Sequence, residues 1–160
     1  MPRVTPFLWY DNQAEEAANF YASVFSNSRV GKITRYPEGS PEGYAPGSAM
    51  TVEFELDGQP VIALNGGPHF RFNEAFSFSI DCDSQEEVDY YWGTLTANGG
   101  EESQCGWLKD RFGLSWQINP RRLVELPADS DPETSKRVIQ AILKMKKIAT
   151  VELERAAAGS

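Results

Sequence analysis

CGWLKDRFGLSWQINP, residues 105–120, combines a turn signal with a strongly alternating run of side chains. Phe112-Gly113 separates two apolar runs, which predicts a tight turn between antiparallel strands. After the turn, large apolar side chains alternate with polar ones: Leu114, Trp116 and Ile118 against Ser115, Gln117 and Asn119. Period two places the two sets on opposite faces of a strand. The polar face is typical of a pocket floor, although a surface strand with its polar face in water has the same pattern.

The composition is that of an ordinary soluble protein, since 41% of the 160 residues are hydrophobic and 24% are charged. With a net charge of -8 and no basic stripe, neither nucleic acid nor an anionic membrane is expected as a partner. The one cationic cluster, Lys144, Lys146 and Lys147, fits a solvated helix face. Apolar runs are too short to span a bilayer, and the N-terminus lacks a signal-peptide pattern. Cys82 and Cys105 form no disulfide framework, so we expect a cytoplasmic protein.

Two similar series of elements are expected along the chain. The first has a strand over 5–10, a helix over 13–25 and strands over 29–36, 50–56 and 60–64, with a loop rich in Pro and Gly at 37–47. Asp57-Gly58 predicts the hairpin turn of this series. The second has a strand over 76–82, a helix over 85–97 and strands over 101–108 and 114–119. Asp11-Asn12 and Asp83-Ser84 are expected to cap the two helices.

These series form an internal repeat. Glu15-Glu16-Ala17 matches Glu86-Glu87-Val88, and Phe20-Tyr21 matches Tyr91-Trp92 at the same offset. Two short helices can resemble each other by chance, but here the strand order repeats as well. One copy has a helix on one sheet face and leaves the other face bare, so two copies predict a curved mixed sheet with a concave pocket. The fold class is therefore α+β, with two βαβββ modules.

We expect a single domain over 1–127, divided into modules at 1–74 and 75–127, and a C-terminal helix and tail over 128–160. Asp131-Pro132-Glu133 is typical of a capped helix start. An apolar stripe follows on this helix, up to Ile148: Val138, Ile139, Ile142, Leu143 and Met145. The stripe is expected to pack on this chain or on a second copy. The alanine-rich end over 154–160 is expected to fray.

Paired modules with these motifs resemble the vicinal-oxygen-chelate superfamily of glyoxalases, bleomycin-resistance proteins and extradiol dioxygenases. The resemblance is closer to its PhnB-like branch, often labelled demethylubiquinone-methyltransferase-like. It is carried by LWYDNQAEEAANFYASVF, LNGGPHFRFNEAFSFSIDC, QEEVDYYWGTL, GWLKDRFGLSWQINP and RVIQAILKMKKI, which together cover most of the chain from Pro6 to Ile148. The resemblance implies a homodimer, in some members with exchanged segments.

The resemblance also implies four metal ligands, from the first and last strands of each module. The matching positions here hold Thr5 or Pro6, Ile62 or Leu64, Ser77, and Gln117. A divalent metal prefers imidazole nitrogen or carboxylate oxygen, so we expect no metal and no other cofactor. Methyl transfer from S-adenosylmethionine is not expected either, because the glycines fall in hairpins and loops rather than in a strand-turn-helix.

Strand residues on the polar face of each module must point away from the helices, which predicts the lining of the concave pocket. We place seven residues there: Trp9, Asn65, His69, Phe72, Ser77, Ser79 and Gln117. His69 either bonds a ligand at the pocket mouth or is a loop histidine bonded to backbone. Cys105 fits a half-buried thiol better than a nucleophile, because no neighbouring base can be inferred.

We therefore expect a PhnB-like protein that binds a small organic molecule in a metal-free pocket, for sequestration or sensing. The alternative is an enzyme that uses the same pocket. It would be either a metalloenzyme of the glyoxalase or dioxygenase type or a metal-free enzyme with acid–base groups such as Asp81 or Asp110.

Overall fold

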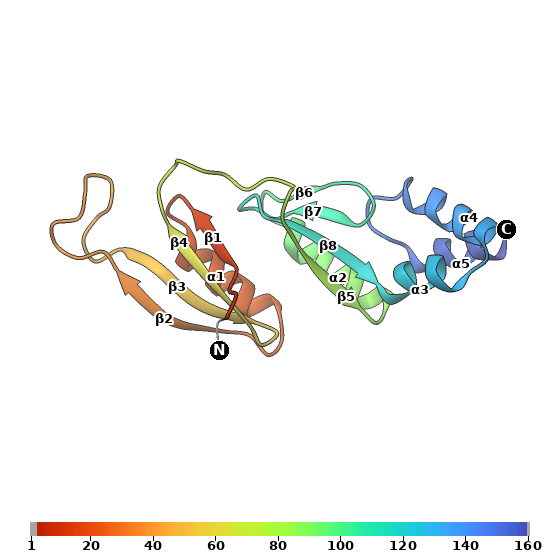
Figure 1. The fold of residues 1–160 in the computed structure, drawn as a ribbon, viewed down its shortest axis with the longest axis horizontal. Coiled ribbons are helices and arrows are strands. Elements are labelled where there is room, and N and C mark those ends of the chain that lie inside the picture. The colour runs from red at the N-terminus through yellow and green to blue at the C-terminus, as the bar shows by residue number, and fades with distance from the viewer. Residues whose placement is uncertain (1–2, 160) are drawn as a thin grey trace. The chain divides into compact units, whose positions relative to one another are not determined.

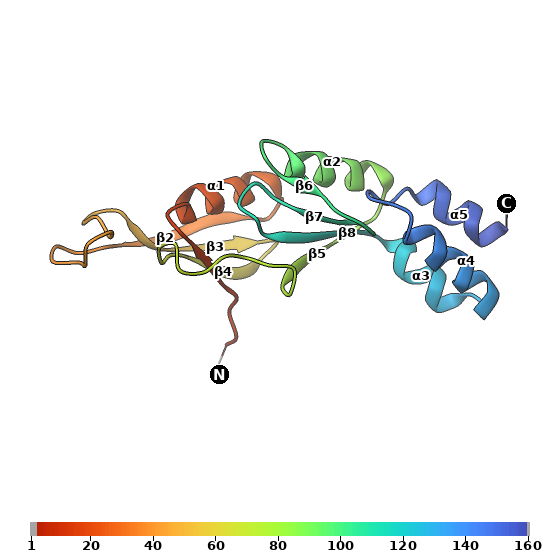
Figure 2. The ribbon, with the colours of Figure 1, turned by 90° about the horizontal axis from the view of Figure 1, so that it is seen from above.

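A computed structural model describes residues 3–159, which form two compact units, one ending at Phe72 and the next beginning at Asn73 (Figures 1 and 2). The strands form two four-stranded mixed sheets, one in each unit. The α+β class and the two βαβββ modules are thereby confirmed. None of the helices in the described residues has the length and hydrophobicity needed to cross a membrane.

The first unit is a sheet with one helix on one of its faces (Figure 2). Its elements are β1 Phe7–Tyr10, α1 Ala14–Val24, β2 Arg29–Arg35, β3 Ala49–Leu56 and β4 Gln59–Asn65. The strand order is β1-β4-β3-β2, with β1 parallel to β4 and the other pairs antiparallel. Asp57 and Gly58 have φ of 47° and 78°, as a two-residue hairpin turn requires, so the predicted turn is confirmed.

The second unit repeats this topology. Its first five elements are β5 Ser77–Cys82, α2 Gln85–Thr96, β6 Glu101–Glu102, β7 Trp107–Lys109 and β8 Ser115–Pro120. The strand order β5-β8-β7-β6, with β5 parallel to β8, matches the first unit strand for strand. The repeat read from the helices therefore extends to the whole connectivity.

The expected strand over 101–108 is wrong in one respect, because it is interrupted between β6 and β7. Trp107 N–H donates to Gln104 O at 3.1 Å, which closes a turn there. Cys105 and Gly106 have φ of 61° and 84°, outside the range of a strand. The interruption turns their N–H groups toward the C-terminal segment, where the carbonyls of Met145 and Lys146 accept them, each at 2.8 Å.

Asp110 organises the hairpin between β7 and β8. Gly113 N–H donates to Asp110 O and has φ of 87°, so the turn spans Asp110 to Gly113 and begins earlier than the predicted Phe112-Gly113 pair. The Asp110 carboxylate is only 2% exposed. It accepts the N–H groups of Phe112 and Leu114 at 2.9 and 3.1 Å and the indole N–H of Trp116 at 2.9 Å. This candidate acid–base group therefore has a structural role.

Each helix packs on one face of its own sheet. In the first unit, Tyr21 of α1 stacks on Phe54 of β3 and hydrogen bonds Tyr10 of β1. In the second, Val88, Trp92 and Leu95 of α2 are buried, and so are Trp116 and Ile118 of β8. The predicted faces of β8 are confirmed, because Trp116 and Ile118 lie in the core whereas Gln117 and Asn119 stay partly exposed.

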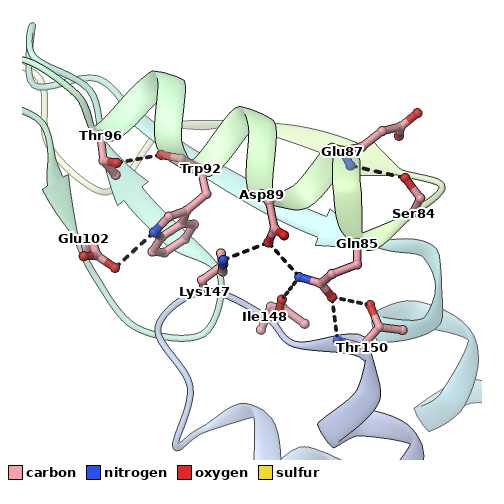
Figure 3. A network of polar contacts seen from close by, with 10 residues as sticks. All are labelled: Ser84, Gln85, Glu87, Asp89, Trp92, Thr96, Glu102, Lys147, Ile148 and Thr150. Atoms are coloured by element: carbon pink, nitrogen blue, oxygen red, sulfur yellow. Dashed lines mark hydrogen bonds and ion pairs between the residues drawn. The ribbon is translucent and has the colours of Figure 1, made fainter.

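The two helices begin differently. Ser84 Oγ accepts the N–H of Glu87 at 3.2 Å and caps α2 as predicted (Figure 3). The predicted cap of α1 by Asp11-Asn12 is wrong, because Ala14 N–H donates instead to Asn65 Oδ1 at 2.8 Å. Parallel pairing of β1 and β4 sets Asn65 beside Tyr10, directly before the helix, so a distant residue replaces the local cap.

Three helices follow β8: α3 Arg121–Asp129, α4 Pro132–Ile142 and α5 Thr150–Ala158. The expected helix start at Asp131 is confirmed, since its carboxylate accepts Thr134 N–H at 2.8 Å. A single helix to Ile148 and a frayed end are both wrong. α4 ends at Ile142, and carbonyls of the segment that follows accept hydrogen bonds from the Cys105-Gly106 turn. α5 then forms over most of the alanine-rich end.

The apolar stripe of α4 packs within this chain. Val138 is fully buried with Leu126, Ile148 and Leu153, and Ile142 and Met145 pack against this cluster. Part of the stripe therefore packs on this chain, and packing of the remainder on a second copy stays a prediction. Ile139 and Leu143 lie off the cluster and are 46% and 62% exposed.

Gln85 joins the C-terminal segment to α2 (Figure 3). Its Oε1 accepts both the N–H and the hydroxyl of Thr150 at 2.8 Å, and its Nε2 donates to Ile148 O and to Asp89, both at 3.0 Å. Lys147 lies 2.8 Å from the Asp89 carboxylate, and these bonds from Lys147 and Gln85 hold the Asp89 pKa below its usual value. Because Ala149 provides no side-chain cap, Gln85 serves as the cap of α5.

Candidate functional site

In the second unit, a row of polar side chains runs along the sheet face opposite α2. Alternation along β5 and β8 places Ser77, Ser79, Gln117 and Asn119 there, and we call these four the polar ladder. Gln117 Nε2 donates to Ser77 Oγ at 3.0 Å, and Asn119 Nδ2 donates to Ser79 Oγ at 2.8 Å. Asn119 Nδ2 is also 3.5 Å from Gln117 Oε1. The bonds fix both amides before any ligand arrives.

The ladder keeps hydrogen-bonding capacity for a ligand. In the part of the chain that the structure describes, the two serine hydroxyls act as acceptors, so their protons remain available, and Asn119 Oδ1 has no partner. Ser115 continues the same row and pairs in register with Ser77. It is 1% exposed, and its buried Oγ has no hydrogen-bond partner among residues 3–159. Such a buried, unpaired hydroxyl is uncommon and marks unused bonding capacity.

Ser115 and Asn119 were not among the seven predicted pocket residues. They alternate with Trp116 and Ile118 in the same way as Gln117, so the strand pattern already contained the signal that places them beside it. Trp107 also lies on this face, as the register partner of Gln117. Lys109, two residues further along β7, forms an ion pair with Glu74.

In the first unit, Trp9 lies on the face opposite α1, between the buried Leu8 and Tyr10. Its indole N–H donates to Gly67 O at 2.9 Å, and its ring meets Phe70 edge-on at 4.9 Å. The ring also lies against Gly66, where an added Cβ would come within 2.3 Å of it. Any larger residue at this position would displace Trp9.

The other three predicted residues of this unit have different surroundings. The Asn65 amide caps α1 and donates to Ala49 O at 3.0 Å, so it belongs to the frame of the unit. Phe72 packs edge-on against Tyr10 at 5.1 Å. His69 is exposed and has no hydrogen-bond partner among the described residues. Hydrogen bonds thus hold Trp9 on Gly67 and Asn65 between Ala14 and Ala49. The lining of a ligand site by all seven residues stays a prediction.

The donor set at the metal positions does not fit a divalent cation. Ser77 and Gln117 bond to each other through a hydroxyl and an amide N–H, and Ile62 and Leu64 have no donor atoms in their side chains. Among residues 3–159, no three His, Cys, Asp or Glu side chains come together as a metal site would require.

The two thiols differ in environment. Burial raises the pKa of the Cys82 thiol to about 12, with smaller contributions from the nearby carboxylates of Glu87, Asp81 and Asp83. The thiol is therefore protonated at neutral pH and a poor nucleophile. Cys105 is partly exposed in the turn before β7.

Comparison with known families decides the relationship. Residues 2–119 match the family described as 3-demethylubiquinone-9 3-methyltransferase. The chain belongs to this family. A putative 3-demethylubiquinone-9 3-methyltransferase of Bacillus cereus, a PhnB protein, is 31% identical, and the match covers 74% of this chain and 99% of that one with a TM-score of 0.67. The resemblance to the PhnB-like branch is confirmed. No curated protein matches the chain.

More distant structures share the fold alone. Protein PA1353 of Pseudomonas aeruginosa is 18% identical, with 75% of this chain and 98% of that one covered and a TM-score of 0.60. The fosfomycin resistance protein FosX of Listeria monocytogenes is 15% identical, with 78% and 97% covered and a TM-score of 0.52. These likenesses agree with the vicinal-oxygen-chelate fold. The family match stops before α3, so helices α3–α5 lie beyond the family core.

Proposed function

We propose that this PhnB-like protein binds a small organic molecule on the polar ladder without a metal ion, for sequestration or sensing. One observation carries the proposal. The amides of Gln117 and Asn119 are held in place by the hydroxyls of Ser77 and Ser79, and all four side chains are at least partly exposed. Fixed polar groups with spare bonding capacity are what a small-ligand site needs for orientation.

The chemistry of the ladder favours uncharged polar groups on the ligand. Amides and hydroxyls pair with carbonyl, hydroxyl and amide groups without the desolvation of a full charge. Lys109, a cation on this face, is engaged by Glu74, and β8 itself contributes only neutral side chains between Ser115 and Asn119. Asp81, the register partner of Asn119, adds one exposed carboxylate at the end of the row. The indole of Trp107, half-buried beside Gln117, offers an aromatic surface for the apolar part of a ligand.

We do not extend the methyl transfer in the family description to this chain. A nucleotide-like cofactor is usually held at a glycine-rich turn between a strand and the following helix. Here β1 leads into α1 through Asp11-Asn12-Gln13, and β5 leads into α2 through Asp83-Ser84. Neither connection contains a glycine, so neither lets a phosphate approach the backbone in that way.

Native mass spectrometry of the purified chain tests the proposal. We expect a bound organic compound on the wild type and loss of most of it in Gln117→Ala, because this change removes the amide that links Ser77 to Asn119. Gln140→Ala is the matched control, since Gln140 is an exposed amide on α4, and it should retain the compound. Equal occupancy in Gln117→Ala and the control would refute binding at the ladder.

A further inference from the structure

Another cavity lies in the first unit, at the end of the sheet where α1 begins. Its volume is about 270 Å³, and its walls come from the β1–α1 turn, the end of β2 and the loop over 36–48. Six polar side chains on these walls matter here: Asp11, Asn12, Glu15, Arg35, Tyr36 and Tyr44. The cavity is separate from the polar ladder and shares no residue with it.

Hydrogen bonds hold the loop wall in place. The hydroxyl of Tyr36 donates to Asn65 O, and the hydroxyl of Tyr44 donates to Gly66 O at 2.8 Å. The two phenol rings lie 5.0 Å apart. Tyr36 N–H also donates to Ser48 O at 2.9 Å, which closes the base of the loop. The loop wall of the cavity is therefore held in place by hydrogen bonds to the backbone of residues 48, 65 and 66.

Arg35 enters this cavity with most of its donors unused. Its Nη1 donates to Gly47 O at 3.2 Å, and its Nη2 is 3.9 Å from Glu15 Oε1, which is beyond hydrogen-bond distance. The other arginine pair of the same sheet is different. Arg29 Nε and Nη2 donate to the two carboxylate oxygens of Glu55 at 3.1 and 3.3 Å, so both charged groups of that pair already have a hydrogen-bond partner.

The acidic side of the cavity is open to solvent, since Asp11 and Asn12 are exposed and Glu15 is partly exposed. Within residues 3–159, the carboxylate of Asp11 and the amide of Asn12 have no hydrogen-bond partner, although both border the cavity. Glu15 makes only the long contact with Arg35. A guanidinium and two carboxylates thus face one small space from two walls, and each has bonding capacity left over.

We propose that this cavity binds a small zwitterion, an α-amino acid or a compound with the same two charges. The ligand carboxylate bonds the Arg35 guanidinium, and its ammonium group lies between Asp11 and Glu15. Charge-assisted bonds of this kind are the stronger hydrogen bonds in proteins. The faces of Tyr36 and Tyr44 contact the aliphatic part of the ligand. A ligand with one charge alone leaves one wall unpaired.

Titration of the isotope-labelled full chain with L-leucine, followed by amide NMR, tests the inference. We expect saturable shifts at Glu15, Arg35 and Tyr44. Isocaproate lacks the ammonium group and isoamylamine lacks the carboxylate, so each should bind about tenfold more weakly or worse, as the loss of one charged hydrogen bond predicts. Absence of a saturable shift with L-leucine, glycine, L-alanine and L-glutamine would overturn the proposal, as would binding of either analogue as tight as that of L-leucine.

Matched variants test whether L-leucine binding depends on the cavity residues or only on the net charge of the protein. Arg35→Gln and Asp11→Asn should each weaken L-leucine binding about tenfold or more. Arg29→Gln removes the same charge from the same strand but from the self-satisfied pair, and it should leave binding unchanged. An equal loss in Arg29→Gln would overturn the assignment. Thermal unfolding checks that each variant is folded. If Arg35→Gln is unfolded, the L-leucine affinity of Asp11→Asn decides whether the proposal holds.

Discussion

Truncation of Trp116 to Ala should strongly destabilise the second unit. The side chain is 1% exposed, packs on Phe78 of β5 beside the buried Leu108 of β7, and donates its indole N–H to the buried Asp110 carboxylate at 2.9 Å. Removal of a buried Trp costs about 3–5 kcal/mol, and loss of its charge-assisted hydrogen bond to Asp110 moves the cost toward the upper end. At about 2–4 °C per kcal/mol for a chain of this size, the midpoint should fall by about 6–20 °C.

Two variants on the other face of the same sheet serve as controls. Gln117→Ala removes a partly exposed amide that bonds Ser77 and makes a long 3.5 Å contact with Asn119, and it should cost no more than about 1.5 kcal/mol. Trp107→Ala makes the same chemical change as Trp116→Ala at a half-buried position, and it should cost clearly less. Urea unfolding followed by circular dichroism measures all three. If Gln117→Ala unfolds the protein and Trp116→Ala is tolerated, the two faces of β8 have been assigned the wrong way round.

Four other measurements follow from the structure. Elemental analysis should find no stoichiometric zinc, nickel or iron, because the donors at Ser77 and Gln117 do not suit these metals; about one metal per chain, lost in Gln117→Ala, would contradict this. Light scattering should give about twice 17.8 kDa for a homodimer, which the exposed Ile139 and Leu143 favour, and a monomer mass at micromolar concentration would count against it. Gln85→Leu leaves Thr150 N–H and Ile148 O without their partner, so it should cost about 1–3 kcal/mol and speed proteolysis between α4 and α5, whereas Gln140→Leu should not. A thiol reagent at neutral pH should modify Cys105 and spare Cys82 until the protein unfolds. Labelling of Cys82 before unfolding would contradict its burial. Because the Cys82 pKa is raised in the folded state, its contribution to stability is complete below the pKa of the unfolded thiol and is lost as pH rises toward about 12.

Local patterns predicted those parts of the fold that depend on local physics. The alternation from Leu114 to Asn119 identified the faces of β8, because one set of large apolar side chains has to be buried. Asp57-Gly58 predicted its turn, because the two-residue turn requires positive φ at both positions. The repeat of Glu15-Glu16 at Glu86-Glu87 predicted that both modules share one topology.

Contacts between distant residues explain what the sequence did not reveal. Asn65 caps α1 from another strand, and only the pairing of β1 with β4 brings it there. The break between β6 and β7 depends on carbonyls of Met145 and Lys146, near the other end of the unit. The fixed geometry of the polar ladder likewise needs β5 beside β8, although alternation alone indicates which of its side chains share a face.

Amide NMR of the labelled chain, titrated with a library of small uncharged organic molecules, tests binding at the polar ladder most directly. The account predicts that the compounds that bind shift the amides of Ser77, Ser79, Gln117 and Asn119, and that a metal chelator leaves these shifts unchanged. Shifts confined to the outer surfaces of the helices, or binding that disappears when the chelator is added, would contradict it.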